Sequence, residues 1–85
     1  MTMNNLHSRA HIELKSQMDV VEFIQKLTAY KDNYTIENKN ANHRINAKSI
    51  LGVILAMYEY AGEMYLVNDT NDGFIPSFVD HYRVL

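Results

Sequence analysis

The chain of 85 residues is long enough for one domain with a single modest core and too short for a two-domain enzyme with an interdomain cleft. It contains no cysteine, which excludes disulfides, thiolate nucleophiles and thiolate metal sites, and which suits a cytoplasmic protein. The net charge is -2 and the lysines and arginines are scattered singly, so no basic stripe for nucleic acid exists and we expect one soluble domain over residues 1–85.

Two elements are predicted before residue 31. Residues 9–15 alternate the apolar Ala10, Ile12 and Leu14 with polar side chains, which is the two-residue period of a half-buried strand. Apolar residues recur at helical spacing over residues 16–30, and Ser16 and Asp19 are placed as a variant of the capping box. The polar face of this helix predicts that its other face covers a sheet.

The middle of the chain predicts a hairpin and a second helix. Residues 34–37 and 43–46 indicate two short strands joined by a turn rich in asparagine. Residues 50–58 are almost continuously apolar and show no alternation, so we predict a short helix that starts at Ser49, with a strand as the alternative. Gly62 is the expected break after it.

The last third of the chain predicts a strand over residues 63–69 and then a third helix. Asn71 or Asp72 is the expected cap of this helix, and Pro76 is tolerable in its first turn. The residues that share its apolar face are Phe74, Ile75, Phe78, Val79 and Tyr82. The element order is therefore β-α-β-β-α-β-α, an α+β open-faced sandwich in which three helices cover one face of a four-stranded antiparallel sheet.

Ser49 allows two interpretations. Serine is a preferred N-cap because its hydroxyl oxygen accepts a free backbone N–H, and position alone favours this role. A phosphate on an N-cap serine would bring negative charge to the positive end of the helix dipole, where it is accommodated while the surface changes sharply. The two roles can hold together.

The apolar residues of the second predicted helix cover an arc of roughly 200°, which is wider than one core-facing stripe needs. Either a partner covers the remainder, or a strongly twisted small domain wraps the helix more fully. We expect Ile50, Leu51 and Ile54 to face outward, whereas Val53 and Met57 should face the core.

The segment INAKSILGVI resembles the signature around the regulatory serine of HPr, the histidine-containing phosphocarrier of the bacterial phosphoenolpyruvate:sugar phosphotransferase system, and of its catabolite-repression relative. The predicted element order is also the HPr order, and the resemblance runs from Ile12 to about Asp69. It implies that an ATP-dependent kinase phosphorylates Ser49. It also implies a patch that docks on enzyme I, on enzyme II components and on regulators, with Lys48, Ile50, Leu51 and Ile54 as the partner-binding candidates.

The phosphate-accepting histidine of HPr is missing from the corresponding helix. The family places it at the N-terminus of the first helix, in a segment like G-[LI]-H-A-R-P-A, where free N–H groups and an arginine bind the phosphoryl oxygens. Aligning this helix puts Ser16, Met18 and Asp19 at the positions of His, Arg and Pro. The sequence LHSRAH offers His7 as a displaced nucleophile and Arg9 as its phosphate clamp, although the predicted strand over residues 9–15 stands between His7 and the helix.

No metal or cofactor is expected, because the four histidines do not fall at zinc-ligand spacings and no cysteine assists them. The apolar run ILGVILAMY is also far shorter than the roughly 18 to 20 residues of a membrane span. We therefore predict a non-enzymatic, cytoplasmic protein that binds phosphotransferase-system components, a serine kinase or a regulator, as a monomer or homodimer. The alternatives are an active phosphocarrier that uses His7 and a homodimeric interaction module of the same fold.

Overall fold

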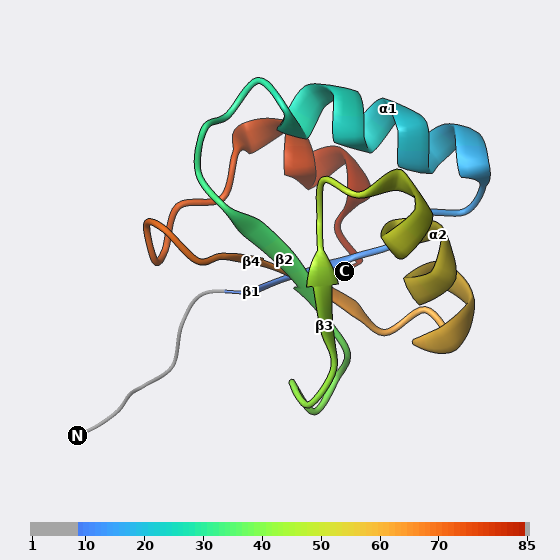
Figure 1. Ribbon diagram of the computed structural model, residues 1–85. Coiled ribbons are helices and arrows are strands. Elements are labelled where there is room, and N and C mark those ends of the chain that lie inside the picture. Colours follow the sequence, from blue (N-terminus) through green and yellow to red (C-terminus); the bar gives the residue numbers. More distant parts are fainter. Residues whose placement is uncertain (1–8, 85) are drawn as a thin grey trace.

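A four-stranded antiparallel sheet with the strand order β1-β4-β2-β3 forms one layer of the structure, and three helices lie on one side of it (Figure 1). The computed structural model describes residues 9–84. The strands are β1 (Arg9–Ile12), β2 (Tyr34–Glu37), β3 (Arg44–Asn46) and β4 (Met64–Asn68), and the helices are α1 (Gln17–Leu27), α2 (Ile50–Glu59) and the 3-10 helix η2 (Ser77–Tyr82). The predicted element order and the α+β open-faced sandwich are confirmed.

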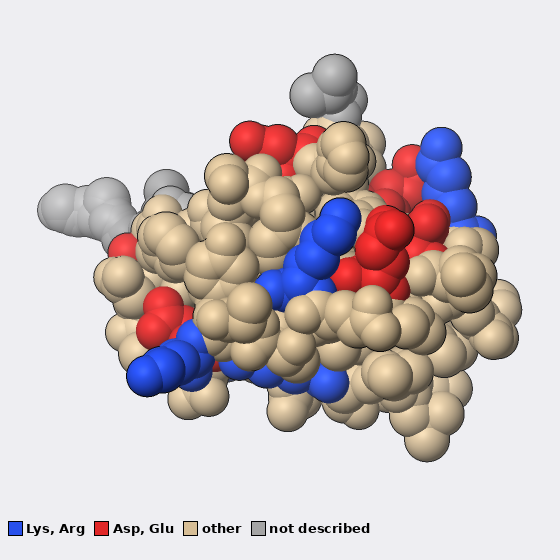
Figure 2. Space-filling model, turned by 90° about the horizontal axis from the view of Figure 1, so that it is seen from above, with Lys and Arg blue, Asp and Glu red and all other residues tan. Residues whose placement is uncertain are grey.

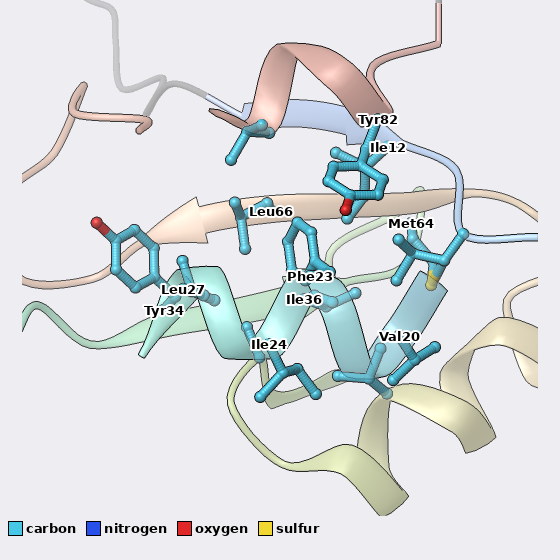
Figure 3. Packing of buried hydrophobic residues seen from close by; sticks show 14 of the residues in the cluster. Ile12, Val20, Phe23, Ile24, Leu27, Tyr34, Ile36, Met64, Leu66 and Tyr82 are labelled. Atoms are coloured by element: carbon cyan, nitrogen blue, oxygen red, sulfur yellow. The ribbon is translucent and has the colours of Figure 1, made fainter. Parts of the chain in front are cut away.

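The core lies between the helices and one face of the sheet. The register pairs Ala10 with Leu66 and Leu66 with Ile36, so these three side chains share that face, and all three are fully buried. Since side chains alternate along a strand, the register puts the polar residues between them on the opposite face. Figure 3 shows Ile36 and Leu66 pointing toward Phe23 of α1.

Helix α1 forms because its apolar residues repeat at helical spacing and its first turn is capped. Val20, Phe23, Ile24 and Leu27 are its buried residues, and they make one stripe against the sheet. The Ser16 hydroxyl accepts the Asp19 N–H at 3.2 Å, and the Asp19 carboxylate accepts the Lys15 N–H at 2.9 Å. The variant capping box predicted from the sequence is thus confirmed, with Lys15 in place of the N-cap residue as the second donor.

The third helix differs from the prediction. It is a 3-10 helix that begins at Ser77, and neither Asn71 nor Asp72 caps it; Pro76 holds the N-cap position with φ -56° and ψ 144°. Proline has no N–H and disfavours helical geometry at the residue before it, so a helix cannot pass from Phe74 through Pro76. The expected apolar face therefore keeps only its second half in helical form.

Asn68 organises the turn that replaces the expected cap. Its side-chain oxygen accepts the N–H groups of Thr70 and Asn71 at 2.9 and 2.7 Å. Its amide nitrogen donates to the Asp32 carboxylate at 2.9 Å and to the Phe74 carbonyl at 3.1 Å. All of the hydrogen-bonding positions of this buried amide face partners, and the turn is fixed before the chain reaches η2.

The predicted strand over residues 9–15 is shorter than expected, because β1 ends at Ile12. The C-terminal segment returns beside it: Ile12 forms an antiparallel bridge with Arg83, and the Glu13 N–H donates to the Tyr82 carbonyl at 2.8 Å. The Val84 N–H donates to the His11 carbonyl at 2.9 Å. These bonds cover backbone groups of β1 that would otherwise form an open sheet edge.

Tyr82 connects this C-terminal segment to α1. Its hydroxyl donates to the Glu22 carboxylate at 2.7 Å, and its ring meets the Phe23 ring edge-on at 5.2 Å between centres. Burial and the hydrogen bond to Glu22 raise the pKa of the Tyr82 hydroxyl above its ordinary value near 10.

We expect Tyr82→Phe to lower the free energy of unfolding by about 1 kcal/mol at pH 7, the usual worth of one hydrogen bond. Because the folded pKa is raised, this contribution is complete below the unfolded pKa of about 10 and is lost as the pH rises toward the folded pKa. Urea unfolding at pH 7 and at about pH 10.5 should therefore show the gap between the two proteins narrowing. Tyr58→Phe, whose side chain is 68% exposed, is the control without an effect, and a gap that stays constant with pH would contradict the assignment.

Candidate functional site at the start of α2

Ser49 is the N-cap of α2. Its backbone is extended, with φ -93° and ψ 113°, and its hydroxyl oxygen accepts the Gly52 N–H at 3.1 Å. Its carbonyl accepts the Val53 N–H at 2.9 Å, which is the first bond of the helix. The predicted helix start at Ser49 is confirmed, and the helix ends before Gly62, whose φ is +81°.

Gly52 lies directly beside the Ser49 cap, where a side chain would be crowded. A Cβ at this position would lie 3.2 Å from the Ser49 hydroxyl oxygen and 3.8 Å from Cβ of Ile45 on β3. A larger residue would therefore press on the cap from within the same turn. The absence of a side chain at Gly52 therefore spares the Ser49 hydroxyl this close contact.

Lys48 is held within the fold. Its ammonium group donates to the carbonyls of Tyr30 and Asp32 at 2.6 and 2.9 Å, and lies 5.7 Å from the centre of the Tyr34 ring. Lys48 was predicted as a partner-binding residue, but these bonds join the start of α2 to the loop between α1 and β2. The ammonium group of Lys48 is therefore already bound by two carbonyls of that loop.

Two of the expected outward residues are exposed. The side chains of Ile50 and Leu51 are 46% and 71% exposed. Ile54 is half-buried and packs against the core, so it adds less to the outer surface than expected. Val53 is fully buried and Met57 packs against the core, as predicted.

Sequence reasoning missed two further outward residues, Leu55 and Tyr58, which are 52% and 68% exposed. Both follow Leu51 at spacings of four and three residues, and this spacing places residues on one line along a helix. That pattern was present in the sequence, but the choice of outward side depended on which side of α2 faces the sheet.

The first turn of α1, which the HPr resemblance compares with the phosphohistidine site, contains no basic side chain. Ser16 is the exposed cap and the Asp19 carboxylate lies beside it. Met18 is 78% exposed and uncharged. This turn therefore presents a carboxylate where a phosphoryl group would need a cation.

The alternative site at His7 and Arg9 can be followed only in part, because His7 lies outside the described residues. The Arg9 guanidinium donates to the Glu37 carboxylate and to the Lys39 carbonyl, both at 3.2 Å. It also lies 4.0 Å from the centre of the Tyr65 ring. Arg9 is thus engaged on the uncovered face of the sheet.

Residues 9–84 contain no cluster of three histidine, aspartate or glutamate side chains that could bind a metal ion. In the same range, none of the helices has the length and apolar character needed to cross a membrane.

Comparisons of the chain with protein-family models, with curated proteins and with solved structures find no match. The likeness to HPr therefore stays a prediction that depends on residues 45–54 and on the element order.

We expect Ser49→Ala to lower the free energy of unfolding by about 1 kcal/mol, because the Gly52 N–H loses its acceptor. Ser49→Asn should keep most of that stability, since asparagine is an equally good cap. Urea unfolding of the three proteins measures the difference. Equal losses in both variants would mean that the cap bond does not hold α2.

Proposed function

We propose that this chain is a non-enzymatic, cytoplasmic protein of the HPr phosphocarrier-like class, which regulates carbon uptake or metabolism by binding other proteins. It acts through the surface formed by Ser49, Ile50, Leu51 and Ile54, and phosphorylation of Ser49 controls that surface. The observation that carries the proposal is the place of Ser49, a half-buried N-cap next to two exposed apolar side chains.

The chemistry of a phosphate at this place supports a switch. A phosphoserine carries about -1.5 to -2 charges at neutral pH, and the N-terminus of a helix attracts negative charge. The first turn of α2 contains no acidic residue that would repel it. The helix is therefore expected to persist while the environment of Ile50 and Leu51 changes from apolar to strongly anionic.

The first turn of α1 argues against a phosphorelay. A relay needs a nucleophile with an adjacent base and a cation for the phosphoryl oxygens. Ser16 has the Asp19 carboxylate at its side, and Met18 brings no charge. The protein is thus proposed to bind the partners of HPr without carrying phosphate to sugar permeases.

The runner-up is an active phosphocarrier that uses His7. Its phosphate clamp would be Arg9, whose guanidinium already bonds to Glu37 and Lys39. If the Arg9 guanidinium left Glu37 to bind a phosphate, the Glu37 carboxylate, which is 2% exposed, would lose one of the cations that offset the cost of its burial. We therefore favour the regulatory function.

Incubation of the purified chain with ATP and an HPr serine kinase tests the proposal. We expect intact mass spectrometry to show a gain of one phosphate, and fragment mapping to place it on Ser49. Ser49→Ala should gain none, and Ser16→Ala, which removes the other helix cap, should be phosphorylated like the unaltered protein.

A second incubation, with phosphoenolpyruvate and enzyme I, separates the runner-up. We expect no acid-labile phosphate on the chain. Efficient transfer that His7→Ala abolishes would establish the phosphocarrier instead, and absence of phosphate in both incubations would reject control through Ser49.

A further inference from the structure

The outer side of α2 is a continuous apolar line. Leu51, Leu55 and Tyr58 are all more than half exposed and follow one another at spacings of four and three residues. The buried residues of the helix, Val53 and Ala56, lie on the other side. A spacing of four and three is the pattern with which helices pair side by side. We call Leu51, Leu55 and Tyr58 the outer seam of α2.

The outer seam is free of charge. Every residue of α2 from Ile50 to Tyr58 is uncharged, and the single charged residue is Glu59 at the C-terminal end. In Figure 2, the lower right of the molecule, on the side where α2 lies, shows uncharged atoms without a blue or red group among them. A basic or acidic partner would find no complementary charge along this line, whereas the apolar side of another helix can pack against it.

The ends of α2 indicate which apolar helix fits. Its N-terminus carries the positive end of the helix dipole, and its C-terminus carries the negative end with the exposed Glu59 carboxylate. Two copies of α2 in antiparallel orientation bring Glu59 of each protomer to the positive end of the other. A two-fold axis between them makes the same surface serve both protomers, as in most homodimers.

From the outer seam and the charges at its ends, we infer that the chain forms a homodimer through antiparallel α2 helices. The two-fold axis passes near Leu55, which packs against the partner's Leu55, and Leu51 packs against the partner's Tyr58. This register follows from the spacing, because Leu51 and Tyr58 lie at nearly equal distances from the middle of a helix that runs from Ile50 to Glu59.

The size of the contact sets the expected affinity. Ten residues of α helix span only about 15 Å, so the pair buries less than the roughly 800 Å² per partner of a standard interface. We therefore expect a dissociation constant on the order of micromolar. At low micromolar concentration the protein is a mixture of monomer and dimer.

The dimer has a consequence at Ser49, the N-cap of α2, because the antiparallel arrangement brings the N-terminal end of each helix beside the C-terminal end of the other, where Glu59 lies. A negative charge at Ser49 would lie near the Glu59 carboxylate at both ends of the dimer. The repulsion between these like charges would favour separate protomers. The dimer itself rests on the outer seam and not on the proposed function, but phosphorylation of Ser49 would supply this charge.

Sedimentation velocity of the full chain between about 5 and 500 µM tests the dimer. We expect dimer at the upper concentrations and a dissociation constant at least tenfold higher in Leu51→Glu. Phe74→Glu is the matched control, because Phe74 is 41% exposed and lies in the loop after β4, away from α2 in Figure 1. Circular dichroism of each variant verifies that it is folded.

A protein that stays monomeric at 500 µM, or a dimer that Leu51→Glu leaves intact, would overturn the inference.

The charge arrangement has its own pair of variants. Ser49→Asp and Ser49→Asn both preserve a good cap, and only aspartate adds charge. We expect the dissociation constant of Ser49→Asp to be about threefold to tenfold higher at low salt, with the difference shrinking at high salt. Equal values for the two would overturn the antiparallel arrangement. A dimer combined with an unphosphorylated Ser49 would reject the proposed function and leave the dimer standing.

Discussion

The scarcity of sheet surface governs the arrangement of the helices. Four short strands offer one covered face, and α1 lies across its centre with four buried side chains. Helix α2 packs against α1 and against β3, a strand of three residues at the edge of the sheet. Only Val53 and Ala56 of α2 are buried, because an edge strand cannot cover a whole helix side. The exposure of α2 is a consequence of its position in the sandwich.

On the uncovered face of the sheet, charged side chains pair with one another where no helix covers the strands. Glu37 is 2% exposed there, and its carboxylate lies 3.2 Å from Arg9 and 3.5 Å from Arg44. A buried carboxylate is tolerable only when cations and hydrogen bonds surround it, and two guanidinium groups meet that need. Charged side chains on β1, β2 and β3 therefore pair with one another on this face. Among the described residues, the large apolar side chains that remain exposed gather mainly on α2.

Local patterns predicted the elements that local interactions create. Ser16 with Asp19 and Ser49 with Gly52 are bonds within one helical turn, so both helix starts could be found from spacing alone. Asn68 with Asp32 and Tyr82 with Glu22 join residues 36 and 60 positions apart, and no short stretch of sequence contains such a pair. The form of the C-terminal segment depends on these distant bonds and on Pro76, which explains why the expected longer helix was wrong.

The two helix N-termini show why charge has different effects on them. At α1, the Asp19 carboxylate lies in the first turn and already accepts the Lys15 N–H. The positive end of the α1 dipole therefore already has an anion beside it. At α2, the first turn has no acidic residue, and the Ser49 hydroxyl satisfies the Gly52 N–H without adding charge. An added anion would therefore be repelled at Ser16 and attracted at Ser49. Both caps are serines, but only Ser49 stands at the end of an exposed apolar surface, where a new charge alters what the surface can bind.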